Sequence, residues 1–328
     1  MSSFKAFMIN KIDGQILGET KRMEAAGLPE GELLIQVSYS SVNYKDALAC
    51  LANGGIVKSY PFIPGIDLAG TIVSSENERF RPGDQVVVTG YRLGVSHFGG
   101  YSEYARVPAE WALKLPPGLS MKEAMILGTA GFTAALSIYE LQQNGVRPED
   151  GPVLVTGATG GVGSVAAAIA AKLGYEVAAS TGKPDKHAYL RELGVKRILS
   201  REELAAGTKR ALDKQLWAGA IDCVGGETLA ALLPQMQYGG VVAACGLTGG
   251  SELSLTVFPF IIRGVRLIGI DSVMVGMEKR SKVWELLAGS YKPQILNELC
   301  NEIGLEQVME QTALLLKGQS KGRTVVKL

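Results

Sequence analysis

The sequence predicts an α/β protein that combines a β-rich N-terminal domain with a doubly wound parallel sheet. Three observations support this fold class. Short strands separated by glycine and proline turns fill the first part of the chain. After Pro148, apolar strands and helices alternate in the manner of βαβ units. Residues 157–163 form a glycine turn that follows one of these strands and opens a helix of small residues.

The N-terminal strands are predicted from their period-two alternation and from the turns between them. They are Leu33–Ser38, Gly70–Ser74, Asp84–Thr89 and Tyr101–Val107. Such a set suggests a barrel or a partly open sheet. From Met121 the pattern changes to helix, with segments Met121–Leu127 and Gly131–Gln142.

The second half alternates regularly between strand and helix. The expected strands are Pro152–Thr156, Glu176–Ser180, Lys196–Leu199, Ala218–Val224 and Gly240–Cys245. The expected helices are Gly163–Leu173, His187–Leu193 and Thr228–Met236. This order predicts a parallel sheet with helices on both faces. A final helix over Leu305–Lys317 and a strand over Gly322–Leu328 follow, and that strand could return to the first domain.

Charge and composition exclude several classes of protein. The 33 Lys and Arg residues nearly balance the 32 Asp and Glu residues, which argues against a nucleic-acid-binding protein. With 47% apolar and 20% charged residues, the chain is typical of a packed globular protein. The longest aliphatic stretch, near Val165–Ala171, is interrupted by Lys172 and Gly174, so no membrane association is expected.

The cysteines and the N-terminus indicate a cytoplasmic location. Cys50, Cys223, Cys245 and Cys300 form no CxxC pair, so neither a four-cysteine zinc site nor a disulfide framework is predicted. Buried apolar cysteines are the expected alternative. The N-terminal segment lacks a hydrophobic core of signal-peptide length.

The glycine turn is the strongest functional signal. Glycine lets the backbone approach a pyrophosphate, whose charge is stabilised by the N–H groups at a helix N-terminus. Here the glycines stand at 157, 160 and 163, a GxxGxxG variant of the usual spacing. The residues predicted to bind a dinucleotide are Gly157, Thr159, Gly160, Gly161, Val162 and Gly163.

The residues after the next strand favour NADP(H) over NAD(H). NAD-binding domains place an acidic residue at this position for the ribose 2′-hydroxyl. In this chain the strand ends in Ser180, Thr181, Gly182 and Lys183, which offer hydroxyl groups and a cation to a 2′-phosphate. Arg201 follows the next strand and could add a second charge. The alternative is a solvated Lys183 with Asp185 on the ribose, although Asp185 has the position of a helix N-cap.

Four further segments carry a family resemblance. They are Asn43–Asp46, Pro61–Gly70, Gly99–Tyr104 and Gly128–Thr133, and with the glycine turn they cover nearly the whole chain in order. The sequence resembles the medium-chain dehydrogenase/reductase superfamily, in particular its zinc-free quinone-oxidoreductase-like YhdH/YhfP branch. That branch includes bacterial NADPH-dependent acrylyl-CoA reductases.

The resemblance implies two domains and a homodimer. A GroES-like barrel domain is expected over 1–122, completed by 290–328, and an inserted Rossmann domain over 123–289. A cleft between them is implied to hold the nicotinamide.

The resemblance also has departures that argue against a metal site. Zinc-dependent relatives carry Gly-His-Glu where this chain has Gly65-Ile66-Asp67, and a zinc-ligating cysteine near the position of Asn43 or Tyr44. Only two histidines are present, so the His and Cys ligand set cannot be matched. Hydride transfer without a Lewis acid suits an activated C=C bond, as in an enone, a quinone or an α,β-unsaturated thioester.

The remaining site residues follow from the resemblance and from strand ends. Tyr44, on the loop after a barrel strand, is expected to line the cofactor site and to position the nicotinamide or to deliver a proton. A tyrosine packed at a domain boundary is the alternative. Leu247 follows a strand at the carboxyl edge of the sheet. Ile261, Ser272 and Gln319 are further expected cofactor contacts.

These observations lead to three functional hypotheses. The first is an NADPH-dependent reductase of α,β-unsaturated acyl-CoA thioesters, such as acrylyl-CoA. The second is a quinone or enone reductase that uses the same site. The third is a protein that binds NADPH without turnover.

Overall fold

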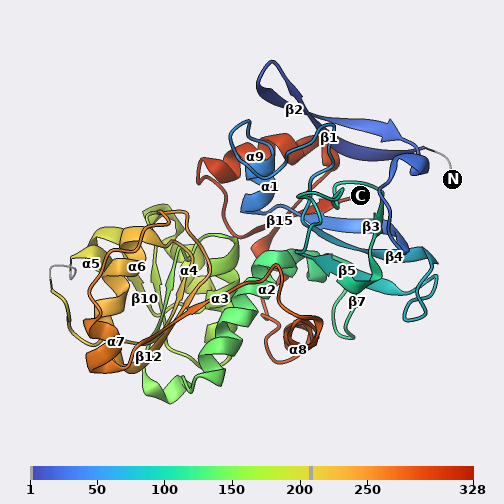
Figure 1. The fold of residues 1–328 in the computed structure, drawn as a ribbon. Helices are drawn as coiled ribbons and strands as arrows, with labels where there is room; N and C mark the ends of the chain where they lie inside the picture. The colour runs from blue at the N-terminus through green and yellow to red at the C-terminus, as the bar shows by residue number, and fades with distance from the viewer. Residues whose placement is uncertain (1–2, 207–209) are drawn as a thin grey trace. The chain divides into compact units, whose positions relative to one another are not determined.

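The computed structural model describes residues 3–206 and 210–328, and the chain divides into two compact units (Figure 1). Unit 1 comprises the chain up to Thr129 together with Val273–Ala288 and Leu296–Leu328. Unit 2 comprises Ala130–Ser272 and Gly289–Ile295. The predicted division assigned residues 123–129 and 273–288 to the dinucleotide-binding domain, whereas the compact units place both in unit 1.

Unit 1 is built mainly of β-strands. Its strands are β1 (Phe4–Ile12), β2 (Gln15–Met23), β3 (Leu33–Ser41), β4 (Asp67–Ser75), β5 (Gln85–Thr89), β6 (Tyr104–Val107), β7 (Ala112–Lys114), β14 (Cys300–Ile303) and β15 (Arg323–Lys327). Its helices are α1 (Tyr44–Ala49), α8 (Met277–Ala288) and α9 (Val308–Leu316), with 3-10 turns at Ala25–Gly27, Ala109–Trp111, Asn297–Leu299 and Leu305–Gln307. It also includes the first part of α2 (Met121–Gln143).

The main sheet of unit 1 runs β14-β15-β3-β4-β5-β7, with β6 also paired to β3. The strand at the C-terminus returns to this domain as the sequence suggested, because β15 pairs antiparallel with β3 and parallel with β14. Alternate residues of the strands supply the core, among them Leu33, Ile35, Leu68 and Val86, all almost fully buried. The sheet thus fixes the positions of the end of β3, at Ser41, and of the start of β4, at Asp67.

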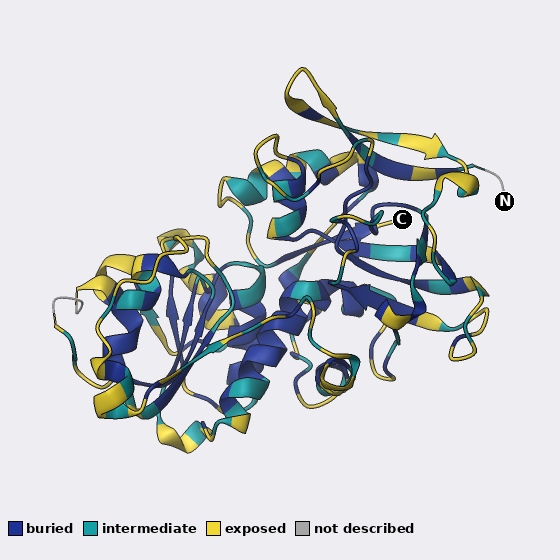
Figure 2. Cartoon of the chain, in the orientation of Figure 1, coloured by how far each residue is buried: buried dark blue, intermediate teal, exposed yellow. Residues whose placement is uncertain are grey.

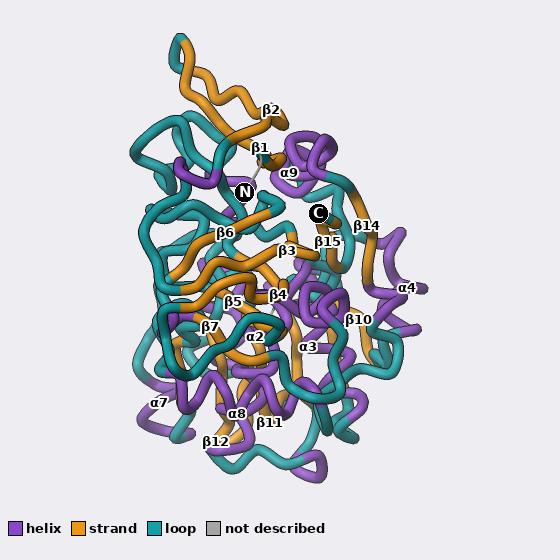
Figure 3. The backbone as a smooth tube through the Cα atoms, turned by 90° about the vertical axis from the view of Figure 1, so that its right-hand side faces the viewer, coloured by secondary structure: helices purple, strands orange, loops and turns teal. Residues whose placement is uncertain are grey.

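The N-terminal hairpin was missed from the sequence. β1 and β2 pair antiparallel from Phe4↔Met23 to Ile12↔Gln15, and their turn projects from unit 1 in two views (Figures 1 and 3). Asp13 and Gly14 both have positive φ, 49° and 79°. Asp-Gly is a strong signal for such two-residue turns, so the sequence did contain the information.

Unit 2 is a parallel sheet flanked by helices. Its strands are β8 (Val153–Thr156), β9 (Val177–Ser180), β10 (Arg197–Leu199), β11 (Trp217–Asp222), β12 (Met236–Ala244) and β13 (Arg266–Gly269). Its helices are α3 (Gly161–Lys172), α4 (His187–Glu192), α5 (Arg201–Ala205), α6 (Gly226–Leu232) and α7 (Phe258–Arg263), with 3-10 turns at Pro148–Asp150, Pro184–Lys186 and Leu233–Gln235.

The strand order β10-β9-β8-β11-β12-β13 confirms the predicted doubly wound sheet. All its pairs are parallel, and the interior of the sheet is buried (Figure 2). Strands covered on both faces become continuous apolar runs, as in the buried residues Val153, Leu154 and Val155 of β8. The order reverses between β8 and β11, where open α/β sheets bind ligands at the carboxyl ends of their strands.

Helix α2 has a break at Gly128, where φ is +52°. The sequence predicted two helices on either side of this point. α2 is long and apolar enough to cross a membrane, but 83% of its most apolar window is buried inside the protein. A core helix has the same composition, and no other described helix meets the length and hydropathy test.

Helix α8 belongs to unit 1 because of Arg280. This side chain is 1% exposed, and its Nη1 donates to the carbonyl oxygen and the hydroxyl of Thr89 at 2.9 and 3.0 Å. The guanidinium also lies 4.6 Å from the ring centroid of Tyr91, a cation–π distance. The buried charge of Arg280 is therefore satisfied by Thr89 at the end of β5 and by Tyr91 just after it.

Candidate active site

The glycine turn joins β8 to α3 as predicted. Gly157 has a φ of +58°, in the region that favours glycine, and Gly160 is the N-cap of α3. A Cβ at Gly163 would lie 2.5 Å from the carbonyl oxygen of Gly157, so the helix packs against the turn only because this residue has no side chain. The first N–H groups of a helix have no partner within it and suit an anion. This geometry fits a dinucleotide pyrophosphate.

The residues predicted to select NADP(H) lie together at the end of β9. Ser180 and Thr181 are buried, and the hydroxyl of Thr181 accepts a hydrogen bond from the Lys183 N–H at 3.1 Å. A Cβ at Gly182 would lie 2.9 Å from Nε of Arg201, so the guanidinium of Arg201 lies against this turn. The structure thus brings two cations from different segments to one strand end.

The surroundings of Lys183 are those of a cationic site. Burial, and then the positive charges of Lys186 and Arg201, lower the pKa of Lys183, with Asp185 opposing them. An anionic ligand would relieve this repulsion, because it supplies negative charge to clustered cations. A dianionic 2′-phosphate is a suitable ligand for such a cluster.

The proposed role of Asp185 as a helix N-cap is wrong. Lys186 is the N-cap of α4, and it makes no side-chain capping bond. Asp185 lies instead in the 3-10 turn Pro184–Lys186, where its carboxylate pairs with the Lys186 ammonium at 2.7 Å. Asp185 is therefore inside the 3-10 turn that leads directly into α4, and it is not the residue that precedes the helix.

Asp222 supports the glycine turn, and sequence reasoning missed it. Its carboxylate is buried at the end of β11 and accepts hydrogen bonds from the Thr156 hydroxyl at 2.6 Å and the Gly225 N–H at 2.8 Å. Thr156 is the residue before Gly157, so this contact ties the ends of β8 and β11 together. Burial raises the pKa of Asp222. An acidic residue directly after a buried apolar strand was the available signal.

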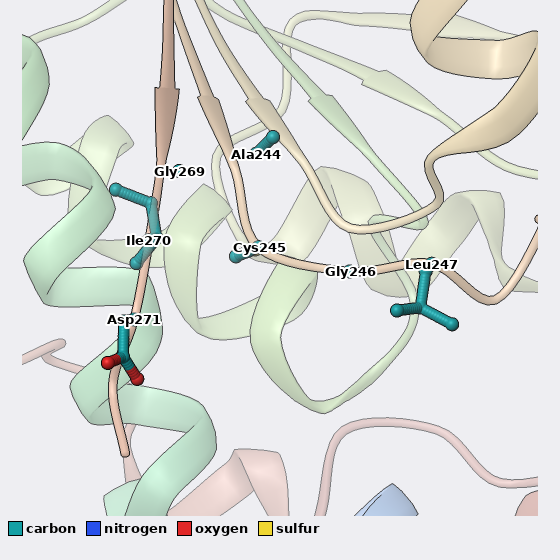
Figure 4. Close-up of a pocket in the computed structure, with 7 residues that line it drawn as sticks. All are labelled: Ala244, Cys245, Gly246, Leu247, Gly269, Ile270 and Asp271. Atoms are coloured by element: carbon teal, nitrogen blue, oxygen red, sulfur yellow. The ribbon is translucent and has the colours of Figure 1, made fainter. Parts of the chain in front are cut away.

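Leu247 and Ser272 lie near the carboxyl ends of β12 and β13. Leu247 is 66% exposed and lines an open pocket of about 440 Å³ (Figure 4). The other lining residues are Ala244, Cys245, Gly246, Gly269, Ile270 and Asp271. Ser272 is buried and follows directly after this pocket. Both residues therefore lie at the edge of the sheet where a cofactor is expected.

Ile261 lies on α7, and its side chain is 73% exposed. α7 packs against the start of β12, because Nη1 of Arg263 donates to the carbonyl oxygens of Pro234 and Met236 at 2.7 and 3.0 Å. Among the described contacts, none joins Ile261 to the glycine turn. Its cofactor contact remains a prediction.

Tyr44 begins a helix, whereas the sequence placed it on a loop. Asn43 is the N-cap of α1, and its N–H donates to the Asp46 carboxylate at 2.9 Å. The Asp46 carboxylate also accepts the Ile66 N–H at 2.9 Å, so it links α1 to the segment before β4. Tyr44 is 43% exposed. The capping box explains this correction, since Asn and Asp at this spacing start a helix.

Asp67 is the centre of a buried hydrogen-bond network in unit 1. Its Oδ2 accepts from the Ser41 hydroxyl, the Asn43 amide and the Thr129 N–H, at 2.5, 2.8 and 2.8 Å. Its Oδ1 accepts from the Thr129 hydroxyl at 2.5 Å. Asp67 therefore fixes the residue before α1 and also caps the part of α2 that follows Gly128.

Arg323 lies in the same network. Nε donates to the Ile126 carbonyl at 2.8 Å and Nη1 to the Val42 carbonyl at 3.2 Å. Burial lowers the pKa of this guanidinium and the charge of Asp67 opposes that effect. Arg323 is thus a structural cation. Gln319, a predicted cofactor contact, is exposed just after α9, where its N–H donates to the Leu314 carbonyl at 3.0 Å.

Comparison with known proteins places the two units in known families. Residues 29–117 match the alcohol dehydrogenase GroES-like domain and residues 161–289 match the zinc-binding dehydrogenase family. YhfP of Bacillus subtilis, which carries a quinone oxidoreductase name, is 51% identical over 99% of both chains. The chain belongs to the YhdH/YhfP family of medium-chain dehydrogenase/reductases.

Two further relatives define this YhdH/YhfP family more closely. Acrylyl-CoA reductase AcuI of Ruegeria pomeroyi is 48% identical over 98% of both chains. The YhdH oxidoreductase of Salmonella enterica, solved in complex with NADP, has a TM-score of 0.96 and 48% identity over 99% of both chains. The YhfP structure has NAD bound and a TM-score of 0.98, covering all of both chains.

Ile66 and Asp67, which stand where the resemblance implies metal-site residues in zinc-dependent relatives, lie in the Asp67 network. Ile66 is buried and apolar, and the Asp67 carboxylate is occupied by hydrogen bonds from three residues. Within residues 3–206 and 210–328, no cluster of three or more His, Cys, Asp or Glu residues is arranged to hold a metal ion. The described residues therefore offer no ligand set for the zinc that gives the matched family its name.

Proposed function

We propose that this protein reduces an activated C=C bond with NADPH, and that its substrate is an α,β-unsaturated acyl-CoA such as acrylyl-CoA. The observation that carries the proposal is the 48% identity to an acrylyl-CoA reductase over 98% of both chains. The glycine turn and the cations at the end of β9 support the cofactor assignment.

The residues fit NADP(H) at two groups. The turn Gly157–Gly163 would hold the pyrophosphate, because it presents the first N–H groups of α3 and its glycines leave no side chain in the way. Ser180, Thr181, Lys183 and Arg201 would hold the 2′-phosphate with hydroxyl donors and two positive charges. The YhfP structure has NAD bound, so the preference for NADPH over NADH is the measurement that tests the 2′-phosphate site most directly.

Bound NADPH supplies the hydride that an activated C=C bond accepts at its β-carbon. The protein is then required to stabilise negative charge on the carbonyl oxygen and to protonate the α-carbon. Tyr44 is the proposed residue of unit 1 for this site. Its hydroxyl either donates the α-proton or positions the nicotinamide, and α1 holds its backbone through Asn43 and Asp46.

A quinone or enone is the second candidate substrate, favoured by the quinone oxidoreductase name of YhfP. Steady-state assays with NADPH and acrylyl-CoA, a benzoquinone or 2-cyclohexenone separate the two. We expect the highest kcat/KM with acrylyl-CoA and unchanged activity in EDTA. Higher kcat/KM with the quinone would favour the second candidate, and NADPH binding without turnover of any acceptor would leave only a binding function.

The proposal includes a homodimer in the cytoplasm. β13 is the last strand of the sheet in the described chain, and the adjacent α7 exposes Phe258, Ile261 and Ile262. An open strand edge beside apolar side chains is a surface that a second copy can cover. Light scattering should give twice the mass of one chain. The cytoplasmic location is consistent with four cysteines that form no disulfide.

A further inference from the structure

Cys223 and Cys245 place two thiols side by side at the edge of the sheet in unit 2. Their Sγ atoms are 3.7 Å apart. The residues follow the paired ends of β11 and β12, because Asp222 is opposite Ala244 and the Cys245 N–H donates to the Asp222 carbonyl at 2.9 Å. The two cysteines therefore continue the ladder as direct neighbours.

This arrangement has the geometry that a disulfide needs. Neighbouring strands lie about 4.7–4.9 Å apart, and disulfides join Cα atoms about 4.4–6.8 Å apart. The remaining change is side-chain rotation together with a small shift of the two strand ends, which shortens the sulfur separation from 3.7 Å to about 2.05 Å. In the part of the chain that the structure describes, the thiol–thiol contact is the one between Cys223 and Cys245, and neither Cys50 nor Cys300 has such a neighbour.

We infer that Cys223 and Cys245 are a modification site, a dithiol that a low-molecular-weight disulfide oxidises to an intramolecular disulfide. Cys245 lines the open pocket at the ends of β12 and β13, so a reagent meets its sulfur first (Figure 4). Cys223 acts second. Its hydrogen bond with Cys245 and its burial raise its pKa, which disfavours a first attack by Cys223.

The oxidation is a two-step thiol–disulfide exchange. The Cys245 thiolate attacks one sulfur of RS–SR, a Cys245–SR bond forms, and RS⁻ leaves and takes up the proton lost by Cys245. The Cys223 thiolate then attacks the sulfur of Cys245, forms the protein disulfide and expels the second RS⁻, which takes up the proton of Cys223. The protein loses two electrons and two protons, and two RSH molecules are produced.

The site is joined to the glycine turn. A Cβ at Gly157 would lie 3.5 Å from Cβ of Cys223, and the Cys223 N–H donates to the Thr156 hydroxyl at 3.0 Å. Movement of Cys223 toward Cys245 therefore displaces a residue that packs under the turn. We expect the disulfide to weaken NADPH binding, a consequence that rests on the proposed function, whereas formation of the disulfide does not.

The test uses the whole protein in glutathione disulfide, with free thiols then blocked by iodoacetamide and the masses measured. We expect loss of two titratable thiols, no retained glutathione and a peptide that joins Cys223 to Cys245. Cys223→Ser should stop at a glutathione adduct on Cys245, Cys245→Ser should give no cross-link, and Cys300→Ser should behave as wild type. Four unmodified thiols, a stable adduct in the wild type, or a cross-link through Cys50 or Cys300 would overturn the inference.

A second measurement separates this inference from the proposed function. Oxidised protein should bind NADP⁺ more weakly by about 5- to 150-fold, and dithiothreitol should restore the affinity. By linkage, NADP⁺ should shift the equilibrium with glutathione toward the dithiol by the same factor. If the cross-link forms in a protein that binds no NADP⁺, the proposed function fails and the dithiol stands. Equal NADP⁺ affinity in both redox states would overturn the coupling.

Discussion

The two units position their candidate residues by different physical means. In unit 2 the backbone does most of this, through the glycines of residues 157–163, while the cations Lys183 and Arg201 stand at a strand end. In unit 1 buried titratable groups do it, since Asp46, Asp67 and Arg323 are each at most 3% exposed, whereas Tyr44 is exposed. Substitution of partly exposed cations can change the preference for a ligand without changing the fold. Buried charges cannot be changed without a cost in stability.

Asp67→Asn should have the largest effect, on the stability of unit 1. The substitution removes the charge that opposes the desolvation of Arg323 and places an NH2 group where one carboxylate oxygen had accepted hydrogen bonds. Loss of one partner of a buried pair costs about 3–5 kcal/mol. Urea unfolding measures this. The control is Asp84→Asn, whose surface pair with Lys114 contributes about 0–1 kcal/mol. Similar losses in the two variants would contradict the network.

Asp46→Asn should change the pH dependence of stability. Burial, and then the charge of Asp67, raise the pKa of Asp46 to about 7. The folded protein then holds a proton that the unfolded chain releases near pH 3.9, so the contribution of Asp46 is complete below about pH 3.9 and is lost as pH rises through about 7. Between pH 5 and pH 8 this contribution falls by about 2–3 kcal/mol.

The variant lacks this titration, so its stability relative to wild type should rise with pH. Urea unfolding of both proteins at several pH values checks the difference. A difference independent of pH would mean that Asp46 stays ionised in the folded protein.

Lys183→Ala should alter cofactor preference and leave the fold intact. A charge-assisted hydrogen bond contributes about 1.5–3 kcal/mol, so the KM for NADPH should rise about tenfold to a hundredfold while NADH use stays nearly unchanged. Lys186→Ala is the matched control, because Lys186 pairs with Asp185 on the same turn. Equal losses with NADPH and NADH would show that Lys183 does not contact the 2′-phosphate.

Gly163→Ala tests the backbone design of unit 2. The added Cβ would lie 2.5 Å from the Gly157 carbonyl oxygen and 2.8 Å from Cα of Ala158, so the turn has to move. Such overpacking costs about 1–3 kcal/mol and should weaken NADPH binding, as followed by unfolding and by fluorescence titration. Gly276→Ala is the control, since nothing lies within 4 Å of its added Cβ. Unchanged NADPH affinity in Gly163→Ala would argue against the turn as the binding element.

Tyr44→Phe should have the smallest minimum effect of these variants, measured as the fall in kcat/KM. It removes one hydroxyl from an exposed ring, and loss of a positioning hydrogen bond costs about 0.5–1.5 kcal/mol, near tenfold. We expect kcat/KM to fall at least to this extent, with Tyr238→Phe, an exposed tyrosine of unit 2, as the control. A fall in kcat beyond about a hundredfold with unchanged NADPH affinity would assign proton donation to Tyr44. Wild-type kinetics would make the tyrosine structural.

Local sequence patterns predicted unit 2 well, because strand, glycine turn and helix are adjacent in the sequence. The candidate cofactor-binding residues are also close to one another in the chain. The proximity of Arg201 to Gly182 also followed, since consecutive parallel strands end at one edge. The network of unit 1 could not be predicted in this way. Asp67 and Arg323 are far apart in the chain, and only the pairing of β15 with β3 brings them together. The Cys223–Cys245 contact was missed because strand register decides it.

The position of β15 has a consequence for biosynthesis. This strand is translated after every other strand that the structure describes, yet it lies inside the sheet of unit 1, between β14 and β3. Unit 2 contains no residue beyond Ile295, so its segments are translated before those that complete unit 1. Domains fold as units in the order in which they emerge. The nascent chain should therefore fold its dinucleotide-binding unit first, while the N-terminal strands of unit 1 complete their sheet only after β15 has been translated.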